Sequence, residues 1–149
     1  MEPHNYYYFC SYPLEVGSIV KPGNWGRILT KYTKEGSLWL PLREMIFESV
    51  RLKDFKDKPS RLETAFVFES IKHATDFSQS RPLDLLYAVQ LVEQQALSHL
   101  GGMNLCAWDE GERIEQILEK ARRYWACDDI ETPELITKSA LRVIDHLPV

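Results

Sequence analysis

The chain has 149 residues, of which 44% are hydrophobic and 27% charged, enough for one domain with a buried core. No stretch approaches the roughly 20 apolar residues of a membrane-spanning helix. The opening MEPHNYYYFC has neither a basic leader nor an apolar signal core. We therefore expect a single domain over residues 1–149, in the cytoplasm and without a membrane partner.

The distribution of charge is more informative than its sum. The net charge of −4 is too mild for a general polyanion binder. Residues 1–62 carry 10 Lys/Arg against 7 Asp/Glu, whereas residues 63–149 carry 8 against 15. Any anion-attracting surface is therefore expected in the first half, although an uneven but solvated surface explains the same numbers. The three cysteines are far apart and form no CxxC, which argues against a disulfide framework or a zinc cage.

The first half of the sequence predicts a strand, a loop and a helix. The aromatic run Tyr6–Cys10 predicts a buried first strand. Residues 13–38 show no clear periodicity and are rich in turn formers, so a looped segment is expected there. From Leu42 the apolar positions follow helical spacing, which predicts a helix ending near Phe55.

The second half mixes strands and helices. Residues 65–68 form a short apolar run typical of a strand, and Ser70 can cap a short helix that reaches Phe77. Residues 85–92 are almost continuously apolar, as in a central strand. An amphipathic helix is predicted from about Glu110 to Trp125. Two β-prone segments, 134–136 and 140–144, follow it, so the order of elements indicates an α+β fold.

Common catalytic motifs are missing from the sequence. It contains no P-loop, GxGxxG, GxSxG or HExxH pattern. Gly101-Gly102 lacks the flanking residues of a phosphate loop and is interpreted as an ordinary turn. Asp128, Asp129 and Glu131 could bind a hard cation, but an acidic surface loop explains them better, so no metal is expected.

Two charged clusters remain open to more than one interpretation. Arg43, Glu44, Glu48 and Arg51 have spacings that place opposite charges side by side on a helix, and a surface salt-bridge ladder is the simpler explanation. Arg61 follows Pro59-Ser60 directly before the 65–68 strand. Its guanidinium could receive a phosphate, or it could form a structural pair with Glu63 or Glu44.

Three stretches resemble the ADP-ribosyltransferase superfamily over nearly the whole chain. YYYFCSYPLEVGSIVKPG is similar to the first strand and loop of the small rifamycin ADP-ribosyltransferases, with Tyr8 at the first motif position. PSRLETAFVFESIKHATDF resembles the second motif, with Phe66 or Phe68 as its aromatic residue. ELITKSALRVIDHL resembles the third motif, with Glu134 at the catalytic position. The combination of REMIFESVR, PSR and YW looks closest to a bacterial family of unknown function within that superfamily.

The resemblance implies a fold and an activity. The fold would be a split β core of two small sheets with peripheral helices and an NAD-binding cleft between the sheets. The activity would be NAD-dependent transfer of ADP-ribose to an acceptor, which could be a protein, a nucleic acid or a small molecule. NAD would be the substrate, and the oligomeric state stays open.

The resemblance also implies roles for individual residues. Glu134 would be the electrostatic catalyst, Tyr8 and Ser60 would contact the nicotinamide-ribose side, Arg61 the pyrophosphate, and Phe66 would stack on nicotinamide. Two alternatives use the same fold: hydrolysis of NAD, or a catalytically silent module that binds a nucleotide or a protein. Tyr8 in place of the usual His or Arg favours the silent module, whereas Glu134 favours an enzyme. If the fold is right, Tyr8, Phe66 and Glu134 must line one cleft.

Overall fold

A computed structural model describes residues 2–31, 38–107 and 109–148. The strands are β1 (Tyr6–Cys10), β2 (Ile19–Val20), β3 (Ala65–Val67), β4 (Leu85–Leu91), β5 (Ser98–Gly102), β6 (Pro133–Thr137) and β7 (Leu141–Leu147). The helices are α1 (Asn24–Lys31), α2 (Trp39–Asp54), α3 (Ile71–Ser78) and α4 (Ile114–Trp125), with short 3-10 helices η1 (Arg61–Glu63) and η2 (Met103–Cys106). In these residues no helix has the length and apolar character needed to cross a membrane.

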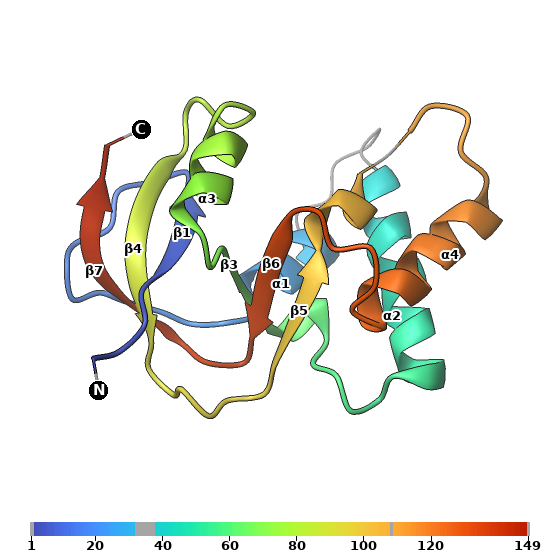
Figure 1. The fold of residues 1–149 in the computed structure, drawn as a ribbon, viewed down its shortest axis with the longest axis horizontal. Helices are drawn as coiled ribbons and strands as arrows, with labels where there is room; N and C mark the ends of the chain where they lie inside the picture. The colour runs from blue at the N-terminus through green and yellow to red at the C-terminus, as the bar shows by residue number, and fades with distance from the viewer. Residues whose placement is uncertain (1, 32–37, 108, 149) are drawn as a thin grey trace.

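The strands form two antiparallel sheets. The larger has the order β1-β4-β7-β2, and the smaller has the order β3-β6-β5. One bridge links the sheets, because Tyr7 and Phe68 exchange backbone hydrogen bonds of 2.9 and 2.8 Å. The smaller sheet lies between the larger sheet and the helices α2 and α4, while α3 covers the larger sheet near β1 (Figure 1). The predicted α+β fold with two small sheets and peripheral helices is confirmed.

The two faces of the smaller sheet pack against two different hydrophobic cores. Leu135 faces the larger sheet, where it packs with Val67, Val89 and Val143. Ile136, its neighbour in sequence, faces the helices and packs with residues such as Phe47. Because side chains alternate along a strand, Glu134 lies on the same face as Ile136, toward the helices.

Several sequence predictions need correction. The first strand is only partly buried, with Cys10 as its buried residue, and β1 stands at the end of the strand order of the larger sheet. The looped segment contains β2 and α1, although residues 32–37 of it lie outside the described residues. α2 begins at Trp39, before Leu42, and α4 begins four residues after Glu110. The predicted central strand is confirmed as β4, which lies between β1 and β7 and ends at Leu91, one residue before the predicted end.

Two glycines allow close approaches that shape the site. Gly101 lies in β5 rather than in a turn, and a Cβ there would be 2.4 Å from Cε2 of Tyr124. Gly26 lies in α1, and a Cβ there would be 2.2 Å from the carbonyl oxygen of Leu62. The tyrosine ring of α4 can therefore lie directly on β5, and α1 can pack directly on η1.

Candidate functional site

A cavity of about 450 Å³ lies where the two sheets meet α1 and the start of α2. Four of the five residues implied by the resemblance line it: Tyr8, Arg61, Phe66 and Glu134. These come from β1, η1, β3 and β6, which are far apart in sequence. The expectation that Tyr8, Phe66 and Glu134 share one cleft is therefore met by the geometry.

Glu134 is held in a fixed orientation inside this cavity. It is the second residue of β6 and is only 6% exposed. Its Oε1 accepts a hydrogen bond from Nη1 of Arg61 and another of 2.9 Å from the hydroxyl of Tyr124. Within the described part of the chain, no hydrogen bond is made to Oε2. One carboxylate oxygen is thus fixed by two donors, and the other makes no hydrogen bond within the described residues.

Arg61 lies at the centre of a buried ion-pair network. Its Nε donates to Oε2 of Glu44 at 2.9 Å, its Nη2 donates to Oε1 of Glu44 at 3.1 Å, and its Nη1 donates to Glu134 and to the Tyr124 hydroxyl. The guanidinium is 4.9 Å from the ring centroid of Phe66. Of the alternatives left open for Arg61, the structural pair with Glu44 is confirmed. Arg61 also lines the cavity, so its contact with a pyrophosphate stays a prediction, although two carboxylates already share its charge.

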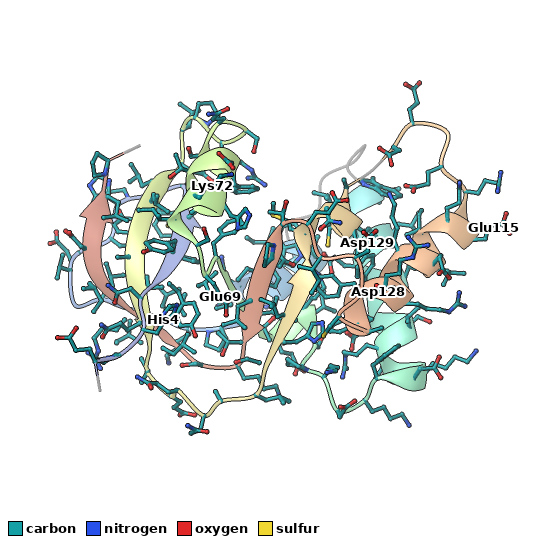
Figure 2. The ribbon with its side chains drawn as sticks, viewed as in Figure 1. His4, Glu69, Lys72, Glu115, Asp128 and Asp129 are labelled. Atoms are coloured by element: carbon teal, nitrogen blue, oxygen red, sulfur yellow. The ribbon has the colours of Figure 1, made fainter. Side chains whose placement is uncertain are left out.

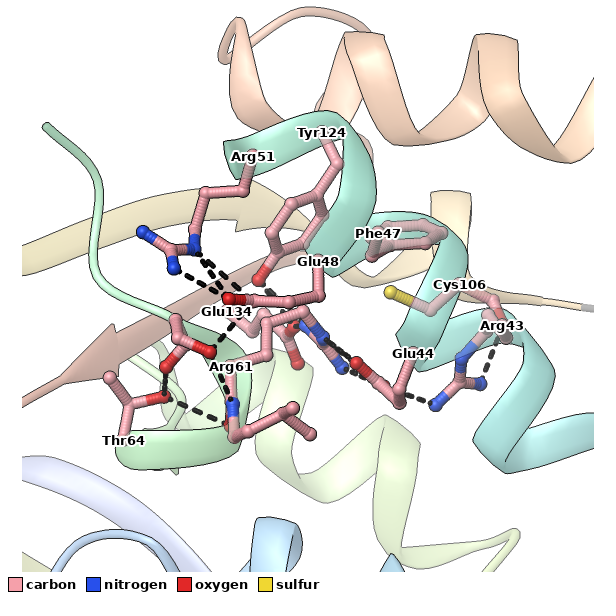
Figure 3. Close-up of polar contacts among 12 residues, drawn as sticks. Arg43, Glu44, Phe47, Glu48, Arg51, Arg61, Thr64, Cys106, Tyr124 and Glu134 are labelled. Atoms are coloured by element: carbon pink, nitrogen blue, oxygen red, sulfur yellow. Dashed lines mark hydrogen bonds and ion pairs between the residues drawn. The ribbon is translucent and has the colours of Figure 1, made fainter. Parts of the chain in front are cut away.

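Glu44 was expected on a surface ladder, and that expectation was wrong for this residue. Glu44 is 1% exposed and contacts Arg43 as well as Arg61 (Figure 3). Burial acts to raise its pKa, but the charges and hydrogen bonds of the two arginines outweigh burial and lower the pKa to about 2. Glu44 is therefore a buried carboxylate that remains ionised at neutral pH.

Ser60 does not face the cavity, so its predicted contact with the ligand is not supported. Its hydroxyl donates to Oε2 of Glu48 at 2.7 Å and accepts from the backbone N–H of Leu62 at 3.1 Å. Glu48 also binds Arg51 (Figure 3). The Nη1 of Arg51 in turn donates a hydrogen bond to the carbonyl of Lys58. Ser60 therefore caps η1 and ties it to α2, which fixes the position of Arg61.

Tyr8 and Tyr124 both keep their phenolic protons at neutral pH. Burial raises the pKa of Tyr8 to about 12. Burial also raises the pKa of Tyr124 well above its ordinary value, an effect opposed by Arg61 and reinforced by Glu134. Tyr124 was missed from the sequence, although it follows Ala121 at helical spacing on the buried face of α4. A hydroxyl-bearing ring on that apolar face was the signal that could have identified it.

The cavity also carries basic residues that the sequence reasoning did not select. Its charged lining residues are Lys21, Arg43, Arg61, Arg81, Asp84 and Glu134. Four of these are basic and two are acidic, but Glu44 contacts both Arg43 and Arg61 from outside the lining, so three carboxylates face the four positive charges.

The acidic loop after α4 lies apart from these residues. Asp128 and Asp129 are exposed between α4 and β6, and Asp129 pairs with Arg123 at 3.6 Å (Figure 2). Over the described residues, no group of three or more His, Cys, Asp or Glu side chains is arranged to hold a metal ion. The predicted carboxylate cluster thus has a structural contact but no metal-binding geometry.

Comparison with known proteins gives a family but no activity. A search among curated proteins found no match. One family matches residues 15–147, a range that contains four of the five predicted site residues and most of the cavity. The chain belongs to this family, which is described as "Protein of unknown function (DUF2441)".

Proposed function

We propose that the protein binds NAD in this cavity and transfers ADP-ribose to an acceptor, with Glu134 as the catalytic carboxylate. The observation that supports this most directly is the convergence of Tyr8, Phe66 and Glu134 on one cavity. A volume of about 450 Å³ falls in the range of small-molecule sites, roughly 300–1,000 Å³. The resemblance to ADP-ribosyltransferases had assigned these three residues to one ligand.

The proposed reaction separates nicotinamide from the ribose. The bond between the ribose C1′ and the nicotinamide nitrogen breaks, and the bonding electron pair leaves with nicotinamide, which becomes neutral. Positive charge develops on the ribose ring, and a nucleophile of the acceptor then attacks C1′ and loses its proton. A carboxylate beside the ring favours this transition state by electrostatic attraction.

The surroundings of Glu134 suit this role. Arg61 pairs with both Glu44 and Glu134, and Glu44 has a second cationic partner in Arg43. Tyr124 and Arg61 hold Oε1, which leaves Oε2 to accept a hydrogen bond from a ribose hydroxyl. Arg61 is thus a positioning residue in this proposal, while Tyr8 would contact the ribose and Phe66 would stack on nicotinamide.

The decisive experiment measures nicotinamide release from NAD by the wild type and Glu134→Gln. The amide keeps the shape of the side chain but removes its negative charge, so turnover should fall by about 100-fold or more. NAD binding, measured by calorimetry, should change little. Tyr8→Phe should lower turnover by at most about tenfold, because it removes a single hydrogen bond.

Glu131→Gln is the matched control, since Glu131 is exposed in the preceding loop and does not line the cavity. Thermal unfolding of each variant separates lost chemistry from lost fold. Release of nicotinamide without any acceptor would indicate NAD hydrolysis. NAD binding without release by the wild type would indicate a silent nucleotide-binding module, for which Tyr8 in place of His or Arg is the supporting observation.

A further inference from the structure

An exposed thiol lies against a buried imidazole in a part of the molecule outside the cavity. Cys127 is exposed in the loop that follows α4 (Figure 1), and His99 is a residue of β5 that is only 3% exposed. The Sγ of Cys127 is 3.8 Å from Nδ1 of His99, and neither residue lines the cavity. A nucleophile within reach of a base, with the base held by a third group, is the arrangement that activates cysteines in proteins.

The hydrogen bonds of His99 determine which of its ring nitrogens can accept a proton. Its Nε2 is 2.9 Å from the backbone carbonyl oxygen of Tyr124. A carbonyl oxygen can only accept a hydrogen bond, so Nε2 carries the hydrogen. Burial lowers the pKa of His99, so the ring is neutral at pH 7 and its Nδ1 has no hydrogen. The thiol of Cys127 is therefore the donor in this pair, and Nδ1 of His99 is the acceptor.

The backbone of Cys127 is unusual for a residue with a side chain. Its φ is 57°, in the left-handed region that favours glycine. The N–H of Cys127 donates to the carbonyl of Tyr124 at 3.3 Å, and the N–H of Asp128 donates to the carbonyl of Arg123 at 2.9 Å. Helices that end with this pair of hydrogen bonds usually have glycine at the position of Cys127. The turn therefore does not explain the cysteine, whereas its contact with His99 does.

We propose that Cys127 and His99 form a reactive thiol site whose substrates are small disulfides. The sulfur of Cys127 attacks one sulfur of the disulfide while the thiol proton passes to Nδ1 of His99. A new S–S bond forms, the old S–S bond breaks, and the leaving thiolate takes the proton from Nδ1, which returns His99 to its neutral form. The products are a mixed disulfide at Cys127 and one free thiol. The site uses neither NAD nor Glu134, so it stands or fails independently of the proposed function.

The site is tested by incubating the folded wild type with cystamine and locating the mixed disulfide by mass spectrometry of peptides. Cystamine is small and symmetric, so attack at either sulfur gives the same product. The adduct should form at Cys127, whereas Cys10 and Cys106, each 6% exposed, should stay unmodified. Cys127→Gly suits the left-handed turn, so this variant should keep the fold and form no adduct.

His99→Gln isolates the contribution of the base. The glutamine amide can still donate to the carbonyl of Tyr124, but it places no base beside the thiol. Adduct formation at pH 7 should slow by about tenfold, because a cysteine without a base is only a few per cent ionised at that pH. His146→Gln is the matched control, since His146 is exposed on β7 in the other sheet, and it should react at the wild-type rate.

A second comparison requires no change to the buried histidine. In wild type unfolded by urea, Cys127 has no fixed base, so it should react about tenfold more slowly than in the folded protein. If His99→Gln does not fold, this comparison decides alone. Equal rates in the folded and unfolded wild type, equal rates in the wild type and a folded His99→Gln, or no adduct at Cys127 would each overturn the site.

Discussion

The two faces of the smaller sheet bury very different side chains. Toward the larger sheet, Leu135 packs in an apolar cluster with residues such as Val89 and Val143, which are fully buried. Toward the helices, Glu134 lies in a buried network with Arg61 and Glu44. The two cores thus lie on opposite faces of the same sheet, yet one is apolar and the other contains charged side chains.

The difference shows which core is explained by stability alone. Apolar burial stabilises a fold directly. A buried ion pair loses hydration, and replacing it by apolar side chains of similar volume is often neutral or stabilising. The network of Glu44, Arg61 and Glu134 is therefore better explained by what it positions in the cavity than by what it adds to stability.

The largest effect is expected when the network loses its central charge. Arg61→Met should lower the free energy of unfolding by about 3–5 kcal/mol at pH 7, because buried Glu134 loses its cationic partner and buried Glu44 keeps only Arg43. Unpaired buried carboxylates have raised pKa values, so they bind protons in the folded state and the loss should shrink as pH falls toward 4. Urea unfolding at both pH values measures this change.

Arg122→Met is the control for that variant. Arg122 lies on the exposed face of α4 and pairs with Glu119, so its removal should cost below about 1 kcal/mol at either pH. If Arg61→Met cost no more than Arg122→Met, the network would not be a coupled buried unit.

A somewhat smaller effect is expected from acid alone. The pKa of Glu44 is about 2 in the folded protein against an ordinary 4.5, so the unfolded chain binds a proton that the folded chain does not between these values. The stabilisation is present above pH 4.5 and is lost as pH falls toward 2, by about 3 kcal/mol from this residue. Urea unfolding across this range, with Glu44→Gln as the variant that lacks the titration, measures it. An equal acid dependence in Glu44→Gln would contradict the assignment.

The smallest effect is expected on the apolar side. Val89→Thr keeps the shape of the side chain but buries a hydroxyl where Val89 is 0% exposed, which should cost about 1–3 kcal/mol. Because the buried residues of that cluster include no Asp, Glu or His, the cost should be the same at pH 7 and pH 4. A pH-dependent cost would mean that the two cores are coupled through β6, and the contrast between them would fail.

The sequence by itself determined the elements whose pattern is local. The continuous apolar run of β4 predicts a central strand, because such a strand is buried on both faces. The amphipathic spacing of α4 predicts a helix that is buried on one face. The sequence did not predict the short strand β2 or β5, which ends in two glycines. Both form strands only because they pair with segments far away in the chain.

Only the tertiary structure decided the chemistry of the site. Spacing on a helix suggested that Glu44 was exposed, but the packing of α2 against η1 buries it against Arg61. Ser60 and Arg61 are adjacent in sequence, yet one caps a turn and the other lines the cavity. Charge, burial and hydrogen bonding act through distances in space, and residues from distant segments set those distances only when the chain is folded.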